Sequence, residues 1–149
     1  MDLMSTINPN NISLHLECSD QEALLQKMTH WLFQSHAITN EAGFLEDVDY
    51  REMLGMTGIG NEVAVPHGSN CVAYPTVAIA TLQAPIAWKS IDDAPVRLVL
   101  LFAEPDEPTP DQAHNTLLTK MIRKLSNDET LYAVKQAATV DEIVNALKE

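Results

Sequence analysis

The stretch that most constrains the fold is VRLVLLFA, residues 96–103, in which Arg97 is the one polar residue. A strand with one exposed face alternates apolar and polar side chains, and this run does not. A nearly continuous apolar run is typical of a central strand that is covered on both faces. We therefore expect residues 96–103 to lie in the middle of a sheet.

Further strand and helix patterns surround this run. Strands are predicted for NISLHLEC, where Ile12, Leu14 and Leu16 alternate, and for residues 76–83 and 85–88. Helices are predicted where capping residues precede apolar stripes, namely after Ser19, over 41–54, after Thr109, after Ser126 and after Thr139. Helices that precede, interrupt and follow a small sheet indicate an α/β fold, a single-domain layered sandwich with a small mixed sheet flanked by helices over residues 1–149.

Composition narrows the classes of function. The chain has 149 residues, of which 46% are hydrophobic, and a formal net charge of −12, which argues against nucleic acid as a partner. The densest basic group is Lys120, Arg123 and Lys124. Cys18 and Cys71 have no metal-ligand spacing and do not suggest a disulfide scaffold. Because the N-terminus also lacks a secretory pattern and no apolar run is long enough to span a membrane, we expect a cytoplasmic protein without direct membrane insertion.

Of the five histidines, His67 lies on the most constrained backbone. Pro66 restricts Val65 to extended geometry, and Gly68 permits a sharp turn or the close approach of another molecule. The apolar residues 63–65 predict a short strand just before it. The imidazole should therefore stand at the end of a rigid element and be presented rather than buried, although PHG by itself also fits a structural turn.

The residues around His67 resemble the signature of a known family. Arg51 and Glu52, followed by TGIGN and VAVPHG, look like the active site of the enzyme IIA family of the phosphoenolpyruvate-dependent sugar phosphotransferase system. The branch is the fructose/mannitol type, which also includes nitrogen-related regulatory proteins. AHNTLLTKMIRKLSNDE is similar to the family's second histidine motif, so the resemblance extends over nearly the whole chain.

This resemblance implies a function and a set of site residues. In the family, the histidine at the position of His67 accepts a phosphoryl group from the histidine-containing phosphocarrier protein and passes it to enzyme IIB for sugar uptake. The equivalents of Arg51 and His114 lie beside it, and neither a metal nor an organic cofactor is implied. The chain departs from the family at Glu62, where a glycine is common, and at Asn115, where an apolar residue is usual.

These residue types suit phosphoryl transfer. Neutral imidazole is nucleophilic near pH 7, and its phosphoramidate keeps a high transfer potential. Arg51 has donors shaped for phosphate oxygens, although it also fits a surface helix residue paired with Glu52 or Asp47. His114, near the start of its predicted helix, would be kept neutral by the helix dipole and could donate to phosphate; otherwise it is a histidine at the edge of the core.

Other residues near His67 are assigned less specifically. Ile59, Val63 and Val65 are candidates for an apolar partner face. Thr57 and Asn61 are either contacts for the phosphoryl group or parts of a structural turn.

Three functions stay open at this point. The first is a transport phosphocarrier, and the second is a regulator whose phosphorylation state controls binding to other proteins. The third is a metal-dependent hydrolase built on His67 and His114, for which the sequence marks no further ligand. Transfer to a cognate enzyme IIB favours the first, altered binding to an unrelated target favours the second, and phosphorylation without zinc excludes the third.

Overall fold

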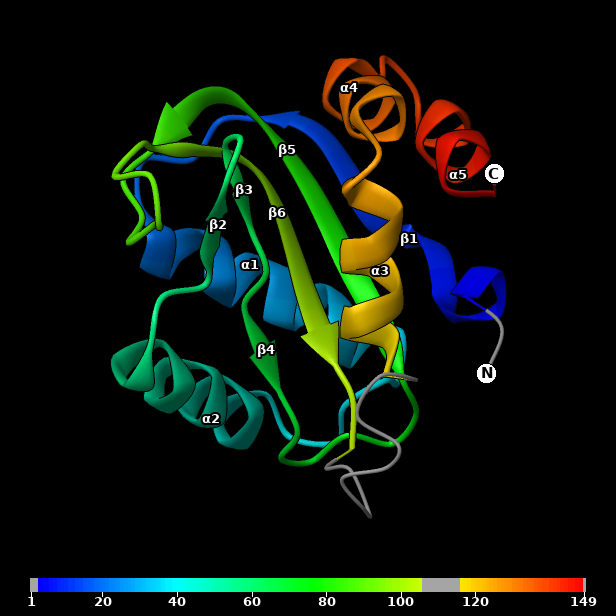
Figure 1. Cartoon of the computed structure of the whole chain (residues 1–149). Coiled ribbons are helices and arrows are strands. Elements are labelled where there is room, and N and C mark those ends of the chain that lie inside the picture. Colours follow the sequence, from blue (N-terminus) through cyan, green and yellow to red (C-terminus); the bar gives the residue numbers. More distant parts are fainter. Residues whose placement is uncertain (1–2, 106–115, 149) are drawn as a thin grey trace.

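The computed structural model describes residues 3–105 and 116–148 and has a mixed sheet at its centre (Figure 1). The strands are β1 (Ile7–Leu16), β2 (Gly58–Gly60), β3 (Val63–Ala64), β4 (His67–Gly68), β5 (Thr76–Ile86) and β6 (Val96–Ala103). Their order is β1-β5-β6-β3-β2, and β4 pairs with β6 beyond the end of β3. β1 is parallel to β5, β5 is antiparallel to β6, and β6 is parallel to β3 and β4. The predicted mixed sheet with 96–103 in its interior is confirmed.

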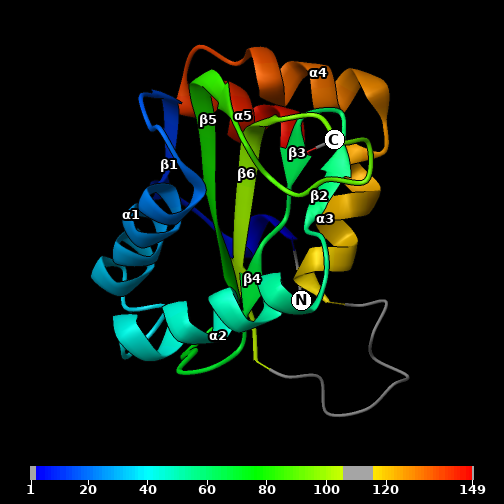
Figure 2. The ribbon, with the colours of Figure 1, turned by 90° about the vertical axis from the view of Figure 1, so that its left-hand side faces the viewer.

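Helices cover both faces of this sheet (Figure 2). They are α1 (Gln21–Gln34), α2 (Glu41–Leu54), α3 (Leu117–Leu125), α4 (Asp128–Gln136) and α5 (Val140–Lys148), and a 3₁₀ turn, η1 (Leu3–Thr6), precedes β1. α1 and α2 belong to one buried cluster and α3, α4 and α5 to another. In β6, Val99 and Leu101 face the first cluster, while Leu100 and Phe102 face the second. The layered α/β class is confirmed, and the apolar character of β6 is explained by its two buried faces.

Two predicted helix caps are shifted by one residue. Asp20, not Ser19, caps α1 by accepting a hydrogen bond from the Ala23 N–H. Asn127, not Ser126, caps α4, and Ser126 instead ends α3 through a bond from its N–H to the Ile122 carbonyl. Because Ser, Asp and Asn are nearly equivalent caps, the packing of the apolar faces decides which neighbour is used.

The prediction of a separate strand at 85–88 is wrong. β5 continues without a break to Ile86, and its register against β6 shifts between Thr81 and Ile86. Such a shift accommodates Pro85, which has no N–H to donate to the ladder. The helix start predicted at Thr109 lies outside the described residues, and α3 begins at Leu117 after Thr116, whose hydroxyl accepts from the Thr119 N–H.

The short strand β4 fixes His67 against β6. The Phe102 N–H donates to the Pro66 carbonyl at 3.0 Å, and the Glu104 N–H donates to the Gly68 carbonyl at 3.2 Å. On the other side, a Cβ at Gly68 would lie 2.9 Å from side-chain atoms of both Phe44 and Val48 of α2. Gly68 therefore permits the close packing that brings α2 beside His67.

Candidate functional site

The imidazole of His67 is half-buried, and one of its nitrogens has a defined partner. Nδ1 lies 3.2 Å from the carbonyl oxygen of Val65. A carbonyl oxygen can only accept, so Nδ1 carries a proton in this contact. In the neutral ring, Nε2 is then the unprotonated nitrogen with a lone pair available for chemistry.

His67 and Arg51 line the same hollow, which has a volume of about 390 Å³. Arg51 comes from α2 and His67 from β4, and the wall is completed by the end of β6 and the start of α3, including Glu104, Thr116 and Leu118. The structure thus brings two of the three predicted site residues together. His114 lies outside the described residues, two positions before Thr116 in the sequence.

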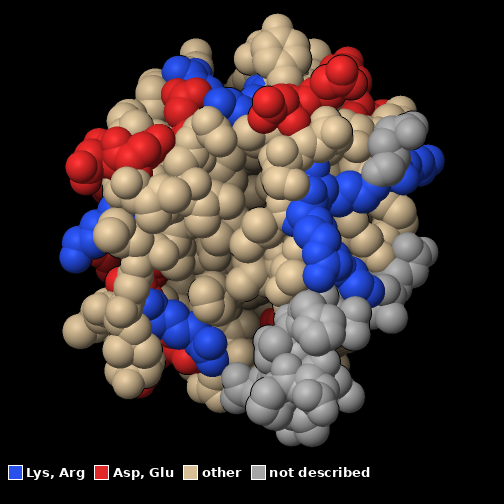
Figure 3. All heavy atoms as spheres, viewed as in Figure 1, with Lys and Arg blue, Asp and Glu red and all other residues tan. Residues whose placement is uncertain are grey.

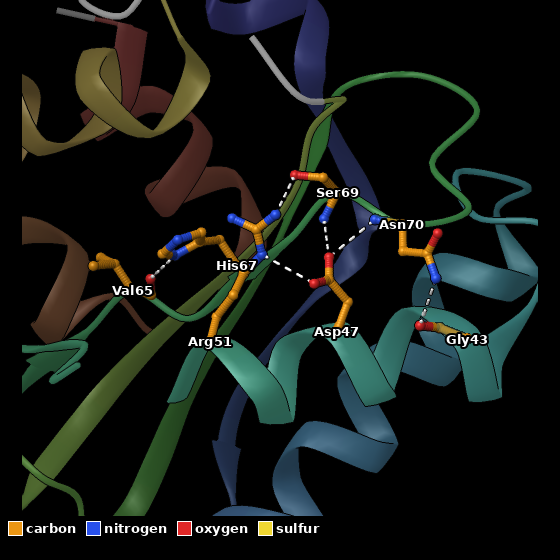
Figure 4. A network of polar contacts seen from close by, with 7 residues as sticks. All are labelled: Gly43, Asp47, Arg51, Val65, His67, Ser69 and Asn70. Atoms are coloured by element: carbon orange, nitrogen blue, oxygen red, sulfur yellow. Dashed lines mark hydrogen bonds and ion pairs between the residues drawn. The ribbon is translucent and has the colours of Figure 1, made fainter. Parts of the chain in front are cut away.

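A polar network, the Asp47 cluster, positions the Arg51 guanidinium (Figure 4). Arg51 Nε donates to Asp47 Oδ1 at 3.2 Å, and Nη2 donates to the Ser69 hydroxyl at 3.0 Å. Asp47 Oδ2 accepts from the backbone N–H groups of Ser69, at 2.8 Å, and Asn70, at 3.1 Å. The pair with Asp47 is therefore compatible with a role for Arg51 in binding phosphate, because Asp47 directs the guanidinium into the hollow of His67.

The charge of Asp47 is favoured by this arrangement. Partial burial raises the pKa of its carboxyl, but the two backbone N–H donors and the Arg51 guanidinium outweigh that effect and hold the pKa below its ordinary value. The sequence offered one signal for this role, which is the four-residue spacing of Asp47 and Arg51 on a helix.

A second network, the Glu52 cluster, lies in the last turn of α2, beside Arg51 in the sequence. Glu52 Oε1 accepts from the Thr57 hydroxyl at 2.6 Å, and Oε2 accepts from the Gln21 amide at 3.1 Å. The Trp88 indole N–H donates to the same Thr57 hydroxyl at 2.8 Å. Burial raises the pKa of Glu52 above its ordinary value, and the two hydrogen bonds and nearby His67 offset this only in part.

Of the three candidates for an apolar partner face, Val63 and Val65 are wrong, whereas Ile59 is half-buried. Val63 and Val65 are only 2% and 5% exposed, because β3 and the residue after it are packed beside the central strand β6. The exposed apolar side chains near Arg51 lie instead at the end of α2 and just after it, at Tyr50, Met53, Leu54 and Met56. The basic group predicted at 120–124 forms a band over α3 (Figure 3).

The departure at Glu62 has a structural counterpart. Its φ of 67° is in the left-handed region that favours glycine, as is the φ of 55° at Asn61. The Glu62 carboxylate pairs with Lys135 Nζ at 3.0 Å and with Arg97 Nε at 3.7 Å. Glu62 therefore adds two ion pairs to a turn that lies at the opposite end of β3 from His67.

Within residues 3–105 and 116–148, no three His, Cys, Asp or Glu side chains gather in a way that could hold a metal ion. In the same part of the chain, no helix is both long enough and apolar enough to cross a membrane.

Comparison with known proteins assigns the family. The family described as phosphoenolpyruvate-dependent sugar phosphotransferase system, EIIA 2, matches residues 5–149. This chain belongs to that enzyme IIA family. Members of the enzyme IIA family are components of a phosphotransferase system, so the chain is a phosphotransferase component.

The relatives of this chain include components of the phosphotransferase system and a nitrogen regulatory protein homolog. The chain is 33% identical to the 2-O-alpha-mannosyl-D-glycerate-specific EIIABC component of Escherichia coli, covering 100% of this chain but 23% of that protein. It is 28% identical to the fructose-like EIIA component of Escherichia coli, covering 98% of this chain and 97% of the relative. It is also 28% identical to the nitrogen regulatory protein homolog of Haemophilus influenzae, covering 96% and 88%.

A solved enzyme IIA structure supports the fold. The nitrogen regulatory protein IIA-Ntr of Neisseria meningitidis superposes with a TM-score of 0.86 at 24% identity, over 97% of this chain and 98% of that one. The layered fold is therefore that of a solved enzyme IIA protein.

Proposed function

We propose that this protein is a phosphocarrier that accepts a phosphoryl group on Nε2 of His67 from the histidine-containing phosphocarrier protein and passes it to enzyme IIB. The transfer would serve sugar uptake of the fructose/mannitol type and would take place in the cytoplasm, with residues 1–149 acting as a single enzyme IIA domain. One observation carries the proposal: Nδ1 is held by the Val65 carbonyl while the ring shares its hollow with the Arg51 guanidinium.

The chemical step is balanced at the two imidazole rings. The Nε2 lone pair of His67 forms the new N–P bond as the N–P bond of the donor breaks, and the donor imidazole leaves with the electron pair of that bond. The proton of His67 stays on Nδ1, hydrogen-bonded to the Val65 carbonyl, which also stabilises the positive charge that the phosphorylated ring acquires. In onward transfer the N–P bond to His67 breaks, Nε2 of His67 keeps the electron pair of that bond, and a nucleophile of enzyme IIB forms the new bond to phosphorus.

Arg51 and His114 would stabilise the transferring group. Phosphoryl transfer needs alignment and charge stabilisation more than covalent chemistry from the protein. The Asp47 cluster aims the Arg51 guanidinium before a partner arrives, so that little reorganisation is needed during transfer. His114, as a neutral imidazole, would donate a hydrogen bond to a phosphoryl oxygen.

The test is phosphorylation by a reconstituted donor system. The protein is incubated with phosphoenolpyruvate, enzyme I and the phosphocarrier protein, and one acid-labile phosphate per chain is expected. His67→Ala should abolish the label, whereas His30→Ala, which removes an exposed histidine on α1, should leave it intact. His114→Ala should impair transfer more than folding. A normal label on the His67→Ala protein would refute the assignment.

The regulatory alternative is supported by the nitrogen regulatory relative. In that function the same phosphohistidine changes the binding of other proteins instead of supplying enzyme IIB. The phosphorylated protein is therefore mixed with a cognate enzyme IIB, and the loss of its label is timed. Complete transfer supports transport, whereas a stable label together with phosphorylation-dependent binding of an unrelated target supports regulation.

A further inference from the structure

We propose that Thr57 is a positioning residue for His67, because it fixes the Val65 carbonyl that selects the protonated nitrogen of the imidazole. The proposal deepens the proposed function and rests on it, since it concerns the same reacting ring. It assigns a specific role to a residue that the sequence left undecided between a turn and a phosphate contact.

Val65 is the direct link between the two residues. Its N–H donates to the Thr57 carbonyl at 2.9 Å, and its own carbonyl accepts from His67 Nδ1 at 3.2 Å. Pro66 follows and restricts Val65 to extended backbone. With its N–H anchored and its dihedral angles restricted, the direction of the Val65 carbonyl is set by the position of Thr57.

Thr57 is itself held from two further sides. The side chain is buried, with the residue 6% exposed, and its hydroxyl lies between the Trp88 indole and the Glu52 carboxylate. The indole N–H can only donate, so the Thr57 oxygen accepts there and its proton is directed to Glu52. The hydroxyl thus makes one donated and one accepted hydrogen bond, and both fix the position of Thr57.

The consequence for the ring concerns its tautomer. If the Val65 carbonyl shifts, the proton is no longer held on Nδ1 and the Nε2–H tautomer becomes populated. That tautomer has no lone pair on Nε2 and cannot form the N–P bond there. The rate of phosphorylation then falls in proportion to the fraction of rings in the competent form.

The experiment measures the tautomer directly in the unphosphorylated protein. Nitrogen-15 NMR of the neutral His67 ring should give the Nδ1–H signature in the wild type and in Thr57→Ser, which keeps the hydroxyl. Thr57→Val should give a mixed signature and accept phosphate about fivefold more slowly from the phosphocarrier protein. Thr57→Val with a wild-type signature would overturn the proposal.

Two further variants separate positioning from general destabilisation. Thr81→Val removes another buried threonine hydroxyl, which accepts from the His15 N–H, and should leave the His67 signature unchanged. Should Thr57→Val fail to fold, Trp88→Phe removes one of the two bonds to the Thr57 hydroxyl and should shift the signature in the same direction; an unchanged signature there also overturns the proposal.

Failure of the proposed function would look different. A shifted tautomer in Thr57→Val, together with no phosphorylation of the wild type, would refute the phosphocarrier function and leave the positioning of the ring established. Normal phosphorylation of the wild type, with an unaltered tautomer in Thr57→Val, would refute the role of Thr57 alone.

Discussion

Two carboxylates on α2, Asp47 and Glu52, flank Arg51 and lie in opposite electrostatic settings. Asp47 accepts from two backbone N–H groups and a guanidinium, which hold its pKa below the ordinary value. Glu52 is more deeply buried and accepts from a hydroxyl and an amide, and burial keeps its pKa raised. The difference indicates a division of roles, in which the Asp47 cluster directs positive charge into the hollow and the Glu52 cluster, through Thr57, holds the backbone just before His67.

The largest effect is expected from removing the charge that the Asp47 cluster directs. Arg51→Ala should slow phosphoryl transfer to His67 by about 100-fold, because one stabilising donor group in a transition state is worth roughly that much. Rapid-quench measurement of phosphohistidine formation gives the rate. Arg97→Ala, at the opposite end of the sheet, is the matched control and should transfer normally. An Arg51→Ala rate close to wild type would leave the Asp47 cluster with a folding role alone.

The next effect is on stability and separates the two carboxylates directly. Asp47→Ala leaves the Ser69 and Asn70 N–H groups without their acceptor and should lower the free energy of unfolding by about 2 kcal/mol. Glu52→Gln keeps an acceptor for the Thr57 hydroxyl. This variant should change the free energy of unfolding by less than about 1 kcal/mol. Urea denaturation measures both, and equal losses would contradict the proposed difference between the clusters.

The dependence of stability on pH should have opposite signs for the two groups. The contribution of the Asp47 carboxyl is present above its ordinary pKa of 3.8 and is lost as the pH falls through its lowered folded pKa. The contribution of Glu52 is fully present below its ordinary pKa of 4.5 and is lost as the pH rises through its raised folded pKa.

This difference is measured as the unfolding free energy of each variant relative to wild type between about pH 3 and pH 7. The advantage of wild type over Asp47→Asn should shrink toward low pH. The stability of wild type relative to Glu52→Gln should fall toward neutral pH. Parallel curves for the two variants would show that the two settings are electrostatically alike.

The smallest effect is expected at Glu62, which provides a baseline for an exposed ion pair. Glu62→Gln should change the free energy of unfolding by about 0.5 kcal/mol or less, since pairs with this exposure contribute little. Urea denaturation in parallel with the α2 variants gives the comparison. A loss as large as that of Asp47→Ala would mean that charge alone, and not the backbone donors, accounts for the Asp47 effect.

Local patterns in the sequence predicted much of this structure. The apolar run of β6 indicated a strand covered on both faces, and the stripe of α2 gave its observed bounds, Glu41–Leu54. The spacing of Arg51 and His67, together with the family resemblance, indicated residues that do share a hollow. These features depend on neighbouring residues or on a motif whose parts are close in the chain.

What the sequence did not indicate depends on contacts between distant segments. Thr57 and Trp88 are 31 positions apart, and no local pattern pairs a hydroxyl with that indole. The burial of Val63 and Val65 cannot be predicted from the sequence, because a strand of two residues is too short to show an alternation of buried and exposed side chains. The one-residue errors in the caps arose where adjacent residues cap almost equally well.

The anchoring of β4 to β6 has a kinetic consequence. The carbonyls of Pro66 and Gly68, on either side of His67, both accept from the central strand, so the proposed transfer to and from Nε2 would need no rearrangement of the main chain. The proposed carrier would then have a small reorganisation energy for transfer. Any protein that distinguishes the loaded form from the empty one must then sense the added negative charge in the hollow rather than a new shape.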